Sequence, residues 1–133
     1  MGSEMCIRDR YGNAIIVNTD FAADNAGVVT DFLGAVAAGW NDVIADPEMG
    51  AKAVAKRNPA ADVALETRRL QLAIDGNVVT DYTMANGMGS IDADRMAKAL
   101  MQIAETYDFQ NAADASLYFT DAYLPAAEAR MLK

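Results

Sequence analysis

The longest regular pattern of apolar and polar positions in this chain spans residues 25–45. Its apolar residues recur at spacings of three and four: Val29, Phe32, Leu33, Val36, Trp40, Val43 and Ile44. This spacing predicts one apolar stripe on an amphipathic helix of about five to six turns. Gly34 and Gly39 lie inside it, and we expect them to mark close packing against another element rather than a break.

Start signals predict further helices. Asp46 is the expected N-cap of a helix with Pro47 at its first position. Asn58 and Pro59 are expected to play the same two roles in the next helix. Asp92 caps a helix with Met96, Leu100, Ile103 and Tyr107 on one face, and Thr19 or Asp20 caps a short turn before residue 25. The predicted helices after residue 45 are 47–57, 59–74, 93–107 and 117–124. Val78-Val79 continue a helix or lie in a loop, and residues 86–89 form a turn.

Residues 13–18, Asn-Ala-Ile-Ile-Val-Asn, form the one good strand candidate. The run is short, continuous and apolar, which favours a strand buried on both faces. One strand cannot form a sheet alone, so its partners should come from elsewhere. The fold class expected is mainly α, with about five helices and one short strand.

Composition narrows the function. The net charge is −8 and the pI is near 4.3, which argues against nucleic acid as a partner. No apolar run approaches the roughly 20 residues of a membrane span, so no direct membrane insertion is expected. The chain has no histidine and a single cysteine, Cys6. We therefore predict no metal site, no catalytic triad and no cofactor.

Residues 1–10 carry a different signal. Back-translation as GTG-GGC-TCG-GAG-ATG-TGT-ATA-AGA-GAC-AG gives the transposase adapter of sequencing libraries, with GTG as start codon. We interpret these residues as an adapter-derived scar and exclude them from the fold argument. Cys6 then falls outside the native part, which is expected to begin at Tyr11 as a C-terminal fragment.

Three segments in order resemble the periplasmic solute-binding proteins of ABC importers, in the branch that binds sulfonates, nitrate-type anions and thiamine-pyrimidine precursors. They are the run from Tyr11 to Asn18 with Phe21 and a long helix; Trp40 to Glu48 with Asn58-Pro59; and residues 87–96 with residues 119–125. The third pair resembles the family's "GxGxMDxxRW" and "YTNxFLP" stretches. The resemblance covers residues 11–125.

This resemblance implies a two-lobed α/β fold, the type II periplasmic-binding-protein fold, that closes on a solute and delivers it to a membrane permease. Residues 11–133 would supply one hinge strand and the C-terminal helical part of the first lobe. It also implies a periplasmic location, with a signal peptide in the missing N-terminal part, and no enzyme activity. The partners expected are a small-molecule ligand and the ABC permease.

In the resembled family the hinge opens onto the cleft at Tyr11, Gly12 and Asn13, which are therefore the predicted ligand-binding residues. Tyr11 would stack or offer its hydroxyl, and Asn13 would hydrogen-bond the ligand. The alternative is a turn in which Gly12 supplies an unusual dihedral angle and Asn13 pairs with backbone.

Other candidates favour structural roles. The Gly87-Met88-Gly89 turn lacks the lysine and third glycine of a phosphate loop, and we interpret it as a capping turn. Trp40 and the methionines favour core packing over ligand binding. Two alternative functions stay open: a thiamine-pyrimidine synthase-like enzyme of the same fold, and a small helical interaction domain that folds on its own.

Overall fold

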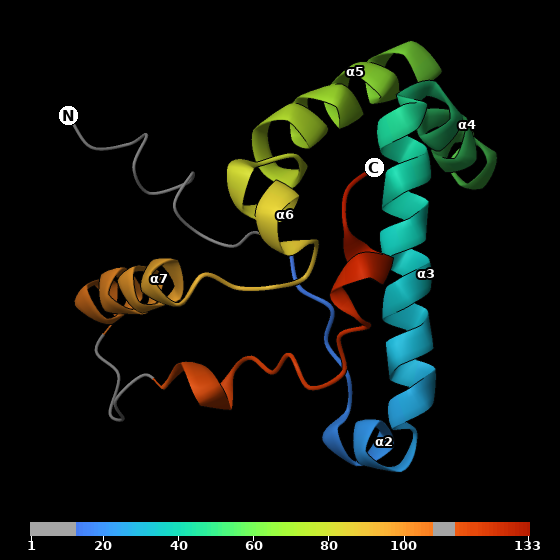
Figure 1. Cartoon of the computed structure of the whole chain (residues 1–133). Coiled ribbons are helices and arrows are strands. Elements are labelled where there is room, and N and C mark those ends of the chain that lie inside the picture. The colour runs from blue at the N-terminus through green and yellow to red at the C-terminus, as the bar shows by residue number, and fades with distance from the viewer. Residues whose placement is uncertain (1–12, 108–113) are drawn as a thin grey trace. The chain divides into compact units, whose positions relative to one another are not determined.

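The computed structural model describes residues 13–107 and 114–133, and the ordered elements in these ranges are helical (Figure 1). The α-helices are α2 (Thr19–Asp24), α3 (Ala26–Ala45), α4 (Pro47–Arg57), α5 (Val63–Ala73), α6 (Asp81–Asn86) and α7 (Ala93–Thr106). A π-helical turn, η1 (Ile74–Val78), follows α5, and two 3-10 turns, η2 (Ala115–Leu117) and η3 (Ala127–Arg130), lie near the end. The mainly α expectation is confirmed at this level.

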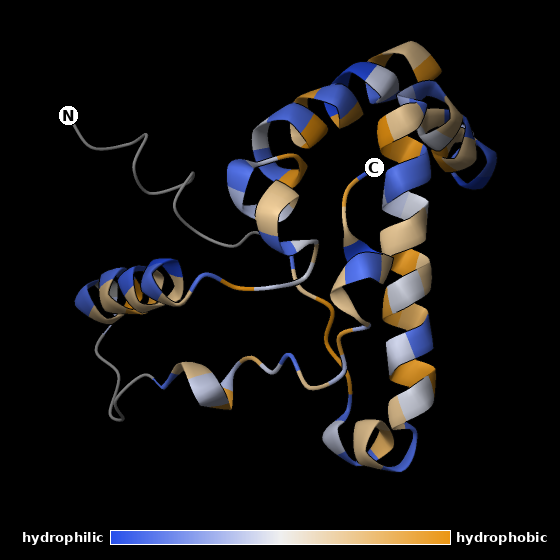
Figure 2. Cartoon of the chain, in the orientation of Figure 1, coloured by the Kyte–Doolittle hydropathy of each residue, from blue (hydrophilic) through white to orange (hydrophobic). Residues whose placement is uncertain are grey.

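The strand predicted for residues 13–18 is wrong within the described chain. These residues are irregular and exposed, and Ile16 keeps 93% of its surface accessible. Figure 2 shows the same segment, which precedes α2, as a hydrophobic stretch. A strand is held by the backbone hydrogen bonds of a neighbouring strand, and the described residues offer none.

The chain divides into two compact units, which we describe separately. Among the described residues, the first unit contains 13–26, 91–107 and 114–122, and the second contains 27–90 and 123–133. The expected division into residues 1–10 and 11–133 rests on residues outside the described ranges and on the DNA, so it stays a prediction.

The second unit is organised around Gly50, at the close approach of three helices. A Cβ atom at Gly50 would lie 2.9 Å from Leu70 Cδ2 of α5 and 3.2 Å from both Cγ atoms of Val43 of α3. Ala51, next along α4, is 1% exposed, and Ile74 at the end of α5 is 3% exposed. Small residues on α4 therefore let α3 and α5 pack against it.

Gly34 and Gly39 behave differently from Gly50. α3 runs through both without a break, as predicted, but a Cβ at either position would meet nothing within 4 Å. The expected close packing at these two glycines is therefore wrong. The sequence pattern identified glycines inside a helix but could not tell which one faces a neighbour.

The helix starts follow capping chemistry. Asp46 Oδ1 accepts from the Met49 N–H at 3.0 Å, with Pro47 at the first helical position, as predicted. Asn58 does not cap α5, because its side chain accepts from Ala60 N–H and its carbonyl from Ala61 N–H, which closes a turn. The helix instead begins at Val63, with Asp62 as its N-cap.

The ambiguous stretch at Val78-Val79 is the end of η1, since that turn ends at Val78 and α6 begins at Asp81. Thr80 and Thr83 form a reciprocal capping box: the Thr83 N–H donates to Thr80 Oγ1 at 3.1 Å, and the Thr80 N–H donates to Thr83 Oγ1 at 2.9 Å. α6 ends at Asn86, and Gly87 and Gly89 follow with φ of +76° and +85°. The predicted turn over residues 86–89 is confirmed.

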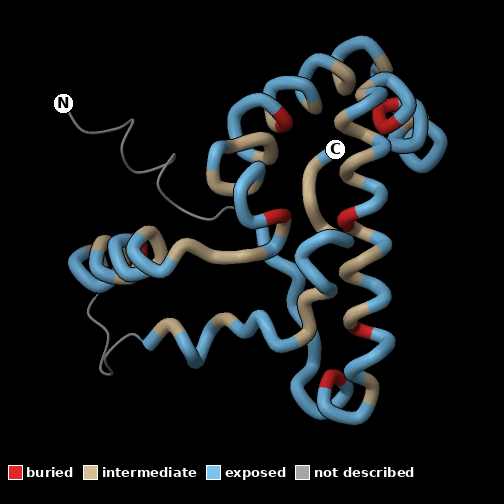
Figure 3. The backbone as a smooth tube through the Cα atoms, viewed as in Figure 1, coloured by how far each residue is buried: buried red, intermediate tan, exposed pale blue. Residues whose placement is uncertain are grey.

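The first unit contains α2 and α7. Asn18, rather than Thr19 or Asp20, caps α2 by accepting from the Phe21 N–H at 3.0 Å. Asp92 caps α7 as predicted, accepting from the Arg95 N–H at 2.8 Å. Ala22 and Ala99 are the buried apolar residues of this unit in the described ranges (Figure 3).

The helix predicted for residues 117–124 is wrong. A single 3-10 turn, η2, precedes an irregular run up to residue 126. The Thr120 hydroxyl accepts from the Ala122 N–H at 3.2 Å, a local bond that competes with helix formation. The preceding tyrosine and phenylalanine are weak helix formers as well.

Helix α3 meets the length and hydropathy of a membrane span, with a mean hydropathy of 1.2 over 18 residues. The expectation that no segment approaches such a span is therefore wrong on composition. Asp31 and Asp42 both lie within α3 and are exposed.

Candidate functional site

Of the three predicted ligand-binding residues, the structure describes only Asn13. Tyr11 and Gly12 lie outside the described residues, so their roles stay predictions. Asn13 lies at the beginning of the exposed segment before α2. Its neighbours Ile15 and Ile16 are 55% and 93% exposed, so this segment presents apolar side chains to solvent.

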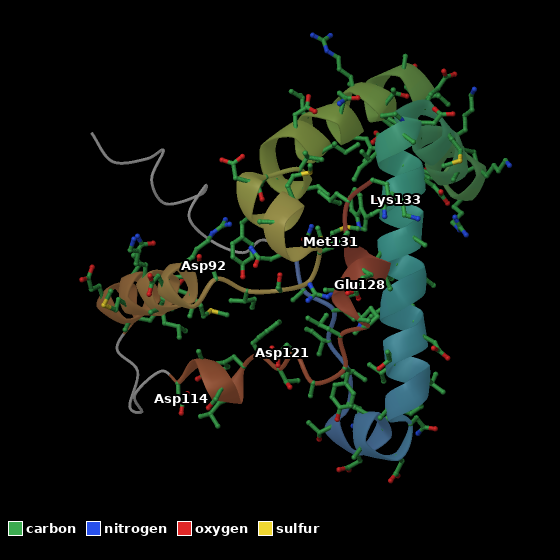
Figure 4. The ribbon with its side chains drawn as sticks, viewed as in Figure 1. Asp92, Asp114, Asp121, Glu128, Met131 and Lys133 are labelled. Carbon is green, nitrogen blue, oxygen red and sulfur yellow. The ribbon has the colours of Figure 1, made fainter. Side chains whose placement is uncertain are left out.

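The first unit contains an open groove of about 880 Å³ along α7. We call it the α7 groove. One side is the apolar stripe of α7, and the other is the segment from Asp114 to Asp121 (Figure 4). The stripe recurs at helical spacing, since Ala93, Met96, Ala97, Leu100, Met101 and Ala104 all line the groove.

The predicted apolar face of α7 coincides only in part with the lining of this groove. Met96 and Leu100 of the predicted apolar face line it, whereas Ile103 and Tyr107 are not among its lining residues. Tyr107 is 60% exposed and lies beyond the end of the helix. Phe119 contributes an aromatic ring from the opposite side. The groove thus has an apolar floor able to contact a flat or aliphatic ligand.

The rim of the α7 groove is acidic and hydroxylated. Asp114 Oδ1 accepts from the Ser116 hydroxyl at 2.8 Å and from the Ser116 N–H at 2.9 Å. These two hydrogen bonds, the hydroxyl's first, lower the pKa of the Asp114 carboxyl from its ordinary value of 3.8. Asp114 is therefore a fixed negative charge at neutral pH.

This electrostatic arrangement selects among solutes. Asp121 adds a second carboxylate to the lining, and none of the described residues that line the groove is basic. Two carboxylates disfavour an anion such as a sulfonate or nitrate. The α7 groove suits an apolar ligand with a cationic or hydrogen-bond-donating group.

Asp114 and Ser116 lie in a stretch that the sequence predicts as a loop, and no motif there marked them as site residues. The available signal was Asp114-Ala115-Ser116, in which an aspartate can hold the N–H two residues later in an Asx turn. That pattern predicts a local turn, and it is the turn that carries Asp114 and Ser116 to the groove.

The other candidates from the sequence, Trp40 and the glycine turn at residues 87–89, are in positions that favour a structural role. Trp40 is half-buried within α3. The backbone N–H of Met88, central to the glycine turn, donates to the Arg130 carbonyl at 2.9 Å. This hydrogen bond occupies the Met88 N–H, which a phosphate loop would use to bind its ligand. The turn therefore has the structural role predicted for it. No cluster of three or more metal-ligating side chains occurs in the part of the chain described.

Comparison with known proteins gives one match. The model of the NMT1/THI5-like family matches residues 3–49, which include the segment before α2, all of α2 and α3, and the start of α4. This match supports a relationship to the sulfonate, nitrate and thiamine-precursor binding proteins at a coarse level. No curated protein and no solved structure matches the chain.

The matched range includes some of the three segments that carry the resemblance and leaves out others. It includes the first segment and most of the second, up to Met49, but not Asn58-Pro59 or the third. The match begins at Ser3, so it also includes residues that we interpret as adapter-derived. Only the DNA upstream of Tyr11 tests that interpretation.

Proposed function

We propose that this chain acts as part of the substrate-binding component of an ABC-type importer for a small organic solute. The resemblance implies a sulfonate or a thiamine pyrimidine precursor as the solute, and the acidic lining of the α7 groove favours the pyrimidine precursor of the two. The observation that carries the proposal is the family match over residues 3–49, because it falls on the segment and long helix that first suggested the resemblance.

The proposed mechanism is a shift between open and closed states of two lobes. A solute that contacts both lobes binds the closed state more tightly and so raises its population, and hinge segments absorb the rotation. Residues 13–18, which are irregular in the described structure, would serve as one hinge segment, and Tyr11, Gly12 and Asn13 would face the solute. The protein would be exported by a signal peptide to the periplasm, where it meets the permease.

The exposure of residues 13–17 supports this placement. All five are exposed, and Ala14 to Val17 form a continuous apolar run. Such a run is typical of a strand covered on both faces in an α/β sheet. In the proposed two-lobed fold, a sheet supplied by chain outside the described residues would cover it and complete its backbone hydrogen bonds.

The first experiment recovers the whole gene. The locus upstream of the Tyr11 codon is amplified from unfragmented source DNA, and the encoded protein is expressed with its own N-terminal region. We expect an open frame that encodes two α/β lobes and a signal peptide. Adapter-like codons behind a genuine start codon in the source DNA would contradict the fragment interpretation.

The second experiment measures binding and site residues in that full-length protein. Isothermal titration against taurine, nitrate and an aminopyrimidine should give saturable binding of one solute. Asn13→Ala should weaken it by about tenfold, the effect of removing one hydrogen bond to a bound ligand. Asn77→Ala, in an exposed turn, is the matched control and should leave the affinity unchanged. Equal affinities for both variants and the unmutated protein would exclude Asn13 from the site.

Two other functions predict different results. A thiamine-pyrimidine synthase-like enzyme of the same fold would release a pyrimidine product, detectable by mass spectrometry, and would lack a signal peptide. A helical interaction domain would give a sharp, cooperative thermal transition for residues 11–133 alone. The uncovered apolar run at residues 14–17 favours the importer component over the independent domain.

A further inference from the structure

The last nine residues of the chain lie against the turn that follows α6 and against α3. We call residues 125–133 the tail and the turn Asn86–Ser90 together with Asn41 the seat. Tail and seat belong to the same compact unit. Figure 4 shows Met131 and Lys133 beside α3. Residues more than forty positions apart in the sequence therefore meet here.

Arg130 makes the central contacts. Its Nη1 donates to the Asn86 carbonyl at 2.8 Å and to the Met88 carbonyl at 3.0 Å. Its own carbonyl accepts from the Met88 N–H at 2.9 Å. α6 ends at Asn86, where carbonyl groups lack helical partners and the helix dipole is negative. The seat thus offers oxygen acceptors arranged for a guanidinium group.

The glycine of the turn makes this approach possible. Gly87 has φ +76°, and a Cβ there would lie 3.1 Å from the Arg130 carbonyl oxygen and 3.3 Å from its carbonyl carbon. Gly89, at φ +85°, would place a Cβ 2.9 Å from Leu124 Cδ2. Any other residue at position 87 would be strained and would meet the tail backbone.

Asn41 provides a second, sequence-independent contact. Its Nδ2 donates to the Met131 carbonyl at 3.0 Å, and its Oδ1 accepts from the Lys133 N–H at 3.1 Å. One side-chain amide thereby pairs with the carbonyl and N–H of backbone two residues apart. Such contacts fix the register of a peptide, and a side-chain contact then selects its sequence.

We propose that the seat is a peptide-recognition site for a segment that carries an arginine in a 3-10 turn followed by extended residues. In this chain the tail occupies the seat in cis. Recognition combines backbone pairing at Met88 and Asn41 with capture of one guanidinium by carbonyl oxygens. Because the acceptors are carbonyls, the seat selects a cation with several N–H donors, and arginine fits this better than lysine.

Covalent attachment gives the tail a high effective concentration at the seat. The same peptide added in trans therefore binds only when the tail is released. The test uses the full chain with Arg130→Ala and a fluorescent synthetic peptide of residues 125–133. Fluorescence anisotropy should show saturable binding to the variant, at least about tenfold tighter than to the unmutated chain.

Two controls make the test specific. A peptide with alanine in place of the arginine should bind the Arg130→Ala chain about tenfold more weakly. Adding Asn41→Ala to that chain should weaken binding of the normal peptide. Equal binding of the two peptides, or no binding to an Arg130→Ala chain whose circular dichroism is unchanged, would overturn the proposal.

A second measurement applies if Arg130→Ala loses its helical signal. In the chain with Asn41→Ala alone, hydrogen exchange at the Met88 and Lys133 amides should quicken by about tenfold. The amides in the middle of α4, which are hydrogen-bonded within that helix, should exchange at the original rate. Unchanged exchange at Met88 and Lys133 would overturn the proposal in that case.

Discussion

The two compact units differ in how far their apolar side chains are buried and their backbone groups hydrogen-bonded. In the second unit, helices approach closely at Gly50, Ile74 is buried, and the tail returns to bond the turn after α6. In the first unit, α7 lines an open groove and residues 13–17 are exposed. This difference shows that the spacing of apolar residues is enough to form helices. A stable core also needs other elements that cover the apolar faces of those helices.

A matched pair of isoleucine substitutions tests this difference with the largest expected effect. Ile74→Ala removes a side chain that is 3% exposed and should cost about 2 to 5 kcal/mol of unfolding free energy. Ile16→Ala removes one that is 93% exposed and should change it by less than about 0.5 kcal/mol. Urea denaturation of both variants measures the two values, and similar costs would contradict the comparison.

A matched pair of glycine substitutions tests the tail contact. Gly87→Ala forces an alanine into positive φ against the Arg130 backbone and should cost about 1 to 3 kcal/mol. Gly39→Ala, in an exposed helical position with open space, should stabilise by about 0.5 to 1 kcal/mol. Thermal denaturation should therefore shift in opposite directions. A stabilising Gly87→Ala would show that the turn does not hold the tail.

The capping box of α6 gives a smaller effect. Thr80→Ala removes the oxygen that accepts from the Thr83 N–H and should cost about 1 kcal/mol. Thr80→Ser keeps that oxygen and should cost clearly less. Urea denaturation compares the two variants, and equal costs would mean that the methyl group of Thr80 matters rather than its hydroxyl.

The smallest effect concerns pH and the rim of the α7 groove. Hydrogen bonds from Ser116 lower the pKa of Asp114 from 3.8, so the folded state favours the carboxylate. The stabilisation is present above pH 3.8 and is lost as pH falls through the lowered folded-state value. An NMR titration of the Ser116 amide should show a midpoint below 3.8, and Ser116→Ala should raise it. A midpoint at or above 3.8 would contradict the observed hydrogen bonds.

Local chemistry made much of the fold predictable. The stripe from Val29 to Ile44 predicted α3, and Asp46-Pro47 and Asp92 predicted two helix starts with their capping bonds. These features depend on residues within one or two turns of each other. Sequence can show them because the interacting groups are neighbours along the chain.

Features that depend on distant partners escaped prediction. Asn58 resembled a cap, but its side chain closes a turn, and Asp62 is the cap instead. Gly34 and Gly39 resembled packing sites, but the close approach occurs at Gly50. The acidic rim of the α7 groove escaped prediction because Asp114 and Asp121 line it from a segment that lies beside α7 only in the folded chain. Of the predicted site, only Asn13 falls within the described chain.

Hydrogen exchange resolved by segment tests the comparison of the two units most directly. In the chain of residues 1–133 near neutral pH, we predict slow exchange in α4, α5 and the Met88 amide, where helices and tail are packed. Residues 13–17 should exchange at nearly the rate of an unstructured peptide. Protection of residues 13–17 comparable to that of α5 would contradict the account, because it would mean that this segment already has a hydrogen-bonded partner.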